Sequence, residues 1–235
     1  MADGIYIGMS GAVARMRQLD SIADNLANAQ TPGFKASKPA FETYLPKGGT
    51  GEKTFVGLVG TGLRLHEGAP VQTGNPLDVF IQGEDFLAVR VGPGQVAYTR
   101  DGRLTVSGDG VLHAAGYPLL DDGGAPLIAP PEETVTIDDR GVVRANQLEI
   151  GRIGFHRIVG PLTRLGGALM APTENAVAVP VAGSLRVGEL ELANTTPLEA
   201  MVEMIGVQRG FDHSMQAIQT YRKLDERAAE IGRVR

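Results

Sequence analysis

The chain has 235 residues, of which 43% are apolar and 21% charged, with 32 glycines, 14 prolines and neither cysteine nor tryptophan. The lack of cysteine excludes disulfides and thiolate metal sites. A net charge of −5 argues against a nucleic-acid partner, because phosphate binding needs a basic surface. So much glycine and proline is typical of a fold with many short strands joined by tight turns.

The N-terminal segment is expected to form an amphipathic helix over about residues 4–29. Its apolar residues recur with alternating gaps of four and three, at Ile5, Met9, Ala12, Met16, Leu19, Ala23 and Leu26. This is the spacing of a coiled-coil seam, since it keeps one stripe facing a partner as helices supercoil. Pro32 and Gly33 end the helix. Gly8 and Gly11 each cost about 1 kcal/mol relative to alanine, so we expect partners to order it.

Residues 34–74 are expected to be an irregular, extended linker. The most flexible part by composition is Lys47-Gly48-Gly49-Thr50-Gly51. One candidate strand pair lies within residues 55–65, around Gly60-Thr61-Gly62.

A β-rich central domain is predicted for residues 75–193. Short apolar runs recur about every ten residues, separated by Asp-Gly and other glycine turns, which indicates antiparallel hairpins. The candidate strands are 77–81, 86–91, 96–100, 104–106, 111–113, 134–137, 142–143, 148–158, 176–179 and 185–187.

A second helix is predicted near the C-terminus, over about residues 197–229. Thr196 as N-cap, Pro197 at the first helical position and Glu199 at the third form a good start signal. Its apolar residues are Leu198, Met201, Met204, Ile205, Phe211, Met215 and Ile218. The predicted fold is therefore a mainly β central domain of short antiparallel strands, flanked by N- and C-terminal α-helices that form a coiled-coil-like helical domain. Residues 1–33 and 194–235 are expected to be the two parts of one assembly domain.

The search for catalytic, cofactor and metal sites identifies no candidate. The four histidines, His66, His113, His156 and His213, are far apart in sequence, and the glycine-rich segments lack the Lys-Ser/Thr ending of a phosphate loop. The adjacent carboxylates, such as Asp121-Asp122 and Asp138-Asp139, read as solvated turn charges. We expect a protein that is not an enzyme and has no cofactor or metal.

Several fragments resemble the axial proteins of the bacterial flagellum, specifically the basal-body rod proteins. They occur in the family's order over both ends and the centre of the chain. The fragments are Met9-Ser10-Gly11-Ala12, Ile22-Ala23-Asp24-Asn25-Leu26-Ala27-Asn28-Ala29, Thr31-Pro32-Gly33-Phe34-Lys35, Thr73-Gly74-Asn75-Pro76-Leu77-Asp78-Val79, Tyr98-Thr99-Arg100-Asp101-Gly102, Leu190-Glu191-Leu192-Ala193-Asn194, Met201-Val202-Glu203-Met204-Ile205 and Gln208-Arg209-Gly210-Phe211. The short central region places the chain among the shorter, proximal members of the rod group.

The resemblance implies a structural subunit of a hollow drive shaft in the periplasm. Its partners would be other rod subunits and further copies of itself. Family members are exported by the flagellar type III apparatus without a cleaved signal, and the N-terminus here shows no signal-peptide pattern. No run of 18 apolar residues is present, so no membrane-spanning segment is expected. In such a shaft the terminal helices form an inner tube and the β domain an outer layer.

We expect the subunit contacts to lie on the two helical stripes and at the end of the first helix. We hypothesise that both terminal segments are poorly ordered in the monomer and fold on incorporation. Asn25 and Asn28 are expected to bond to backbone or to a neighbouring helix. The expected contact residues are Ile5, Met9, Met16, Leu19, Asn25, Leu26, Asn28, Leu198, Met201, Ile205, Phe211, Met215 and Ile218.

Four alternatives remain. The two helices could merely pair with each other and cap a monomeric β domain. The chain could be the longer, distal kind of rod subunit, although Phe86-Leu87 departs from the distal-rod pattern. It could also be a β-rich adhesin or binding module with helical oligomerisation ends, or a carbohydrate-acting enzyme on a β scaffold.

Overall fold

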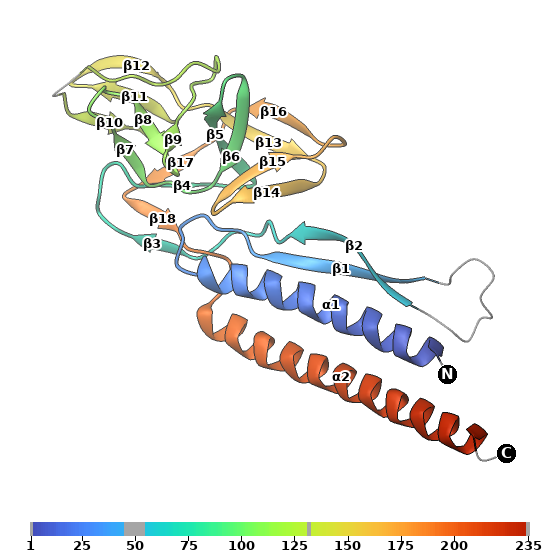
Figure 1. The fold of residues 1–235 in the computed structure, drawn as a ribbon. Helices are drawn as coiled ribbons and strands as arrows, with labels where there is room; N and C mark the ends of the chain where they lie inside the picture. Colours follow the sequence, from blue (N-terminus) through green and yellow to red (C-terminus); the bar gives the residue numbers. More distant parts are fainter. Residues whose placement is uncertain (1, 45–54, 131–132, 234–235) are drawn as a thin grey trace. The chain divides into compact units, whose positions relative to one another are not determined.

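The computed structural model describes residues 2–44, 55–130 and 133–233. Helix α1 (Ala2–Ala27) comes first, helix α2 (Pro197–Arg233) comes last, and strands β1 to β18 lie between them (Figure 1). The chain forms two compact units, which we name the helical unit (within residues 1–27, 37–62 and 197–235) and the β unit (28–36 and 63–196). The predicted class, a mainly β region of short antiparallel strands between two terminal helices, is confirmed.

In the helical unit, α1 and α2 lie side by side and run in opposite directions (Figure 1). Gly8 of α1 is next to Ile218 of α2, and Gly11 is next to Ser214. Helix α1 ends at Ala27, slightly before the predicted end, because the chain turns there: the Thr31 amide donates to the Asn28 carbonyl at 2.9 Å. Helix α2 begins at Pro197, as its start signal predicts, and is longer than expected.

The segment predicted to be an irregular linker contains strands, so that expectation needs correction. Strands β1 (Ser37–Tyr44) and β2 (Phe55–Leu63) form a two-stranded sheet, and β1 lies against α1. Strand β1 contains Pro39 and lacks an alternation of apolar and polar residues, so a search for strand patterns does not find it. Its stability comes from packing on the neighbouring helix, which the local sequence does not show. The predicted flexible stretch 47–51 lies outside the described residues.

The β unit is built around a six-stranded antiparallel sheet with the order β14-β15-β6-β5-β13-β16. Two pairs of strands that are far apart in sequence meet at its centre. Leu87 of β5 pairs with Phe155, and Thr99 of β6 pairs with Leu169. The strands are β5 (Asp85–Gly92), β6 (Gln95–Thr99), β13 (Phe155–Val159), β14 (Leu162–Gly166), β15 (Leu169–Pro172) and β16 (Val177–Val181).

Four smaller antiparallel sheets complete the β unit. They pair β4 (Val79–Ile81) with β17 (Leu185–Val187), β3 (Pro70–Gln72) with β18 (Glu189–Glu191), β7 (Leu104–Val106) with β8 (Leu112–Ala114) and β9 (Tyr117–Pro118), and β10 (Val135–Ile137) with β11 (Val142–Ala145) and β12 (Leu148–Arg152). The predicted strand 148–158 is in fact two strands, β12 and β13, which are separated at Ile153 and Gly154. At Gly154 the backbone passes so close to Asp121 that a β-carbon would collide with it.

The core of the β unit lies on both faces of β5. Leu87 and Val89 belong to one apolar cluster, while Phe86 and Ala88 belong to a second. Because neighbouring residues of a strand point to opposite faces, a strand that is buried on every side chain must be covered on both faces. This accounts for the continuous apolar run 86–89, which lacks the alternation of a strand with one face in water.

Candidate assembly surface

The apolar residues of α1 divide between two faces of the helix. The inner face packs on α2: Ile22 is 2% exposed and clusters with Leu19 and Leu26 against Ala200, Met204 and Val207. A second face, which we name the outer face of α1, consists of Tyr6, Met9, Val13 and Met16, whose side chains are 47–59% exposed. Their spacing of three and four residues places them together on one side of the helix.

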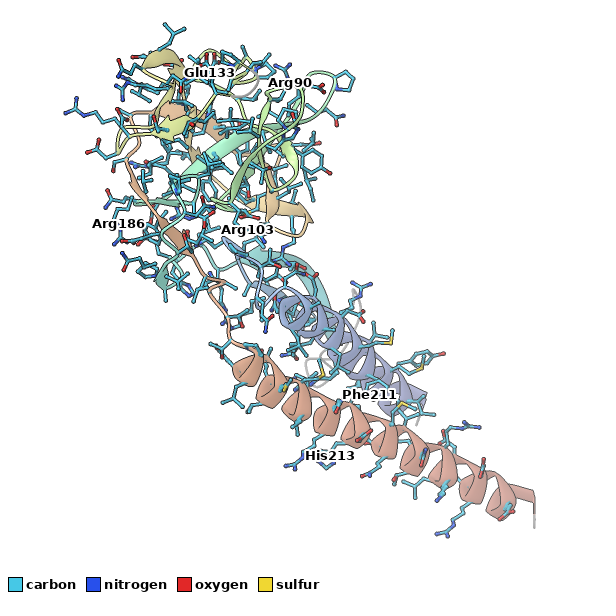
Figure 2. All side chains as sticks on the ribbon, turned by 90° about the vertical axis from the view of Figure 1, so that its left-hand side faces the viewer. Arg90, Arg103, Glu133, Arg186, Phe211 and His213 are labelled. Carbon is cyan, nitrogen blue, oxygen red and sulfur yellow. The ribbon has the colours of Figure 1, made fainter. Side chains whose placement is uncertain are left out.

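Helix α2 has the same division. Its more buried residues, Ala200, Met204, Val207, Phe211, Ser214 and Ile218, recur with gaps of four and three, which is the spacing of a two-helix seam. Figure 2 shows Phe211 on the side of α2 toward α1 and His213 on the opposite side. The outer face of α2 consists of Leu198, Met201, Val202 and Ile205, exposed by 73%, 49%, 63% and 52%.

Small residues let the two helices approach closely. A β-carbon on Gly210 would lie 3.2 Å from Nε of Arg15, and one on Gly8 would meet Ile218. A hollow of about 330 Å³ remains where α1, α2 and β1 meet, lined by Gly11, Ala14, Arg15, Gln18, Phe41, Gly210 and Ser214. The pairing is therefore close but incompletely filled.

Asn25 fixes the end of α1 to strand β1. Its side-chain amide donates to the Ser37 carbonyl at 2.8 Å, and its Oδ1 accepts the Ser37 amide at 2.8 Å. The Asn25 side chain thus makes two hydrogen bonds to the backbone of one residue, one as donor and one as acceptor. Paired β-strands make the same two bonds to each other, so the buried Asn25 side chain takes the place of a neighbouring strand. Asn28 stands at the turn after the helix, where its Oδ1 accepts from the Thr31 hydroxyl at 3.4 Å.

The structure thus separates the predicted contact residues into groups. Met9, Met16, Leu198, Met201, Ile205 and Met215 are exposed, so they are available to a partner. Leu19 and Leu26 pack in the cluster between the helices, Ile218 lies against Gly8, and Ile5 and Phe211 are half-buried. Tyr6, Val13 and Val202 were missed, although their exposure and spacing place them on the outer faces. Met9, Val13 and Met16 recur at helical spacing in the sequence, but Met9 and Met16 also belong to the stripe predicted from Ile5 to Leu26.

The part of the chain that the structure describes contains no group of three histidine, aspartate or glutamate side chains able to hold a metal ion. Among the same residues, neither helix is long and apolar enough to cross a membrane. The distinctive feature of the helical unit is therefore its pair of exposed apolar faces.

Comparison with known proteins finds family matches at both ends and in the centre of the chain. Residues 5–35 match the flagella basal body rod protein model, residues 80–145 the flagellar hook protein FlgE/F/G D1 domain, and residues 186–231 the flagellar basal body rod FlgEFG protein C-terminal model. Over 241 aligned residues the chain is 34% identical to the flagellar basal-body rod protein FlgF of Mesorhizobium japonicum, covering 99% of each chain. The chain belongs to the flagellar basal-body rod family.

Within the rod family the chain is most like FlgF. It is 30% identical to the FlgF protein of Salmonella typhimurium, covering 98% of both chains. It is also 32% identical to the FlgG protein of Borreliella burgdorferi, covering 94% of this chain and 95% of the relative. The residues of both outer faces lie within the segments matched by the rod models. The outer face of α1 lies within residues 5–35, and the outer face of α2 lies within residues 186–231.

Proposed function

We propose that this chain is a structural subunit of the flagellar basal-body rod, of the proximal, FlgF-like kind, and that it polymerises through the outer faces of its terminal helices. The observation that carries the proposal is that α1 and α2 pair through one face each and still expose a second apolar face. Monomeric proteins seldom expose contiguous apolar surface without a partner for it.

The energetics favour association through these faces. Full burial of a valine, leucine or methionine side chain contributes about 1.5–3 kcal/mol. The eight outer-face residues are roughly half exposed, so each can contribute about half of that amount when a partner covers it. The outer faces of α1 and α2 differ in sequence, and a contact between unlike surfaces that does not close produces a helical filament.

Membership of the rod family supports the remaining parts of the proposal. Residues 1–33 and 194–235 would together form the assembly domain, with the coiled-coil contacts made between helices of different subunits. Other rod subunits and copies of this chain would be the partners, and the flagellar type III apparatus would export the chain to the periplasm without cleavage of a signal. The finished rod would transmit torque and conduct later subunits, which requires no catalytic residue. We also propose that the helical unit, in which few apolar side chains are buried between α1 and α2, becomes fully ordered only when the subunit is incorporated into the rod.

One alternative within the family has an observation in its favour. The FlgG protein of Borreliella burgdorferi aligns with 94% of the chain at 32% identity, which keeps the distal rod as a second candidate. An adhesin or a carbohydrate-acting enzyme has no comparable support.

Quantitative mass spectrometry of isolated hook–basal bodies tests the proposal. We expect this chain at a few copies, below the level of a longer distal-rod subunit from the same preparation. Copies equal to or above those of every other rod subunit would move the assignment to the distal rod. A deletion strain should lose motility and regain it with the full chain, and basal bodies that lack this chain altogether would contradict the flagellar role.

A further inference from the structure

Three of the sequence fragments described above meet at one buried site in the β unit. Lys35, Arg100 and Glu191 come from distant parts of the chain, yet the side chains of all three are only 1% exposed. The Lys35 ammonium lies 2.5 Å from Glu191 Oε1, and Nε of Arg100 lies 2.5 Å from Glu191 Oε2. One carboxylate therefore holds two cations, and we name these three residues the latch.

Each cation also donates to backbone carbonyls, and Arg100 has more of them. The Arg100 guanidinium donates to the carbonyls of Ile81, Gly83 and Asp85 at 2.6–2.7 Å, so β4, the turn after it and the first residue of β5 hold it in place. The Lys35 ammonium also donates to the carbonyl of His66 at 2.7 Å. Arg100 thus has three carbonyl partners besides Glu191, whereas Lys35 relies more heavily on Glu191.

Glu191 supplies the one negative charge of the latch, whose three residues together carry a formal net charge of +1. Without its carboxylate, two buried cations would face each other, and the nearest other acid, the half-exposed Glu67, lies 3.7 Å from Arg100. Burial lowers the pKa of Lys35 even though the Glu191 carboxylate attracts its proton, which agrees with a strongly desolvated site. An unpaired buried charge is among the most destabilising defects in a protein.

Around the latch, the chain segment that follows α1 lies beside the segment that precedes α2. The Gly33 amide donates to the Glu191 carbonyl at 2.8 Å, and the Asn194 amide donates to the Phe34 carbonyl at 3.2 Å. Strand β18, which carries Glu191, pairs with β3, a strand of three exposed residues. A ladder of three residue pairs in which one strand is exposed adds little stability.

We propose that Glu191 is a positioning residue that holds these two segments together, and that the latch opens as a local unit without unfolding the six-stranded sheet. The sheet keeps its apolar clusters on both faces of β5, and the carbonyls of Ile81, Gly83 and Asp85 still hold Arg100. The segments keep secondary attachments, chiefly Phe34 stacked 4.2 Å from the Arg164 guanidinium and the Asn194 side chain bonded to Ala36 and Arg64. This proposal does not depend on the rod assignment.

The test is amide hydrogen exchange, followed by NMR on the full chain, in a double-mutant cycle. Glu191→Gln keeps one acceptor oxygen but turns an amide donor toward a cation. The Gly68 amide donates to Glu191 Oε1 at 2.7 Å, so it also reports on this carboxylate. We expect the amides of Gly33, Gly68 and Asn194 to exchange at least about tenfold faster, while amides of β5 and β6 change little. Lys35→Met leaves a balanced Arg100–Glu191 pair, so its effect should be much smaller.

The effect of Lys35→Met on the Glu191→Gln chain distinguishes a surplus of buried charge from a loss of packing. In the double variant with Lys35→Met and Glu191→Gln, one surplus cation is gone, so exchange should be slower than with Glu191→Gln alone. Glu189→Gln, on the same strand but in a partly exposed pair with Arg186, is the matched control and should leave these amides unchanged.

Three outcomes would overturn the proposal. One is a Glu191→Gln chain in which the sheet amides exchange as fast as Gly33, or in which no folded sheet remains. Another is a double variant that is worse than Glu191→Gln, since that would mean loss of packing. The third is unchanged exchange at Gly33, Gly68 and Asn194 after Glu191→Gln.

Discussion

Gly8 of α1 lies so close to Ile218 of α2 that a β-carbon at residue 8 would be 2.8 Å from Ile218 Cγ1. At Gly11, one turn along, a β-carbon would be 3.7 Å from the Ser214 hydroxyl, which is an ordinary contact. Helix propensity alone favours alanine at both sites by about 1 kcal/mol. We therefore expect Gly11→Ala to stabilise the helical unit and Gly8→Ala to stabilise it less or to destabilise it. Urea unfolding followed by helical circular dichroism measures both; equal gains would mean that the helices are not packed this closely.

The two faces of α1 predict opposite results for the same substitution. Leu19→Lys places a charge in the cluster between the helices and should cost the helical unit roughly 1–3 kcal/mol. Met16→Lys, at a site that is 52% exposed, should change stability by less than about 0.5 kcal/mol. It should nevertheless abolish incorporation into basal bodies, which complementation of a deletion strain measures.

Met16→Leu is the matched control, because it keeps the apolar surface and should restore incorporation. Normal rods from the Met16→Lys chain would show that this face has no partner, and would favour the view that the helices only pair with each other.

The contact between Asn25 and Ser37 can be tested at one atom. Asn25→Ala leaves the Ser37 amide and carbonyl without their partner in a buried site, which should cost about 1–3 kcal/mol. Asn25→Asp keeps an acceptor for the amide but faces the carbonyl with a second oxygen, so it should also destabilise the helical unit. Thermal unfolding of the three chains compares them. If Asn25→Ala melted like the original chain, the bond would contribute nothing and the buried position would need another explanation.

His156 predicts how stability changes in mild acid. Burial lowers its pKa below the ordinary value of 6.5, partly offset by a bond to the Gly154 backbone. The unfolded chain then binds a proton at a higher pH than the folded chain, so stability is complete above pH 6.5 and is lost as the pH falls below it. Urea midpoints at about pH 7.5 and pH 5 should differ more for the original chain than for His156→Gln. Identical pH dependence in both chains would remove His156 as the cause.

Local patterns in the sequence predict the elements well but not the faces they bury. The start of α2 follows from Thr196, Pro197 and Glu199, and the class of fold follows from the recurrent apolar runs. The stripe through Ile5, Met9 and Leu19, however, combines residues of two neighbouring faces, because gaps of three and four also join one face to the next. Only the partner helix decides that Leu19 is packed while Met9 is exposed.

The latch could not be deduced from spacing at all. Glu191 is 156 residues from Lys35 and 91 from Arg100, and an isolated lysine, arginine or glutamate normally reads as a surface charge. The fragments that contain them point to a family, yet their meeting at one carboxylate depends on how several strands and loops fold. Strand β1 was hidden for a similar reason, since α1 stabilises it.

The strand order of the large sheet also has a consequence for the timing of folding. Strands β5 and β6 form a hairpin early in the chain, but their other neighbours, β13 and β15, come after residue 150. A lone hairpin is marginal in water, and pairing over such long loops is slow. A nascent chain that has not yet reached residue 155 therefore cannot hold the complete six-stranded sheet, although the sheets β7-β8-β9 and β10-β11-β12 lie before that residue. The order of the strands therefore delays completion of the six-stranded sheet until most of the chain has been synthesised.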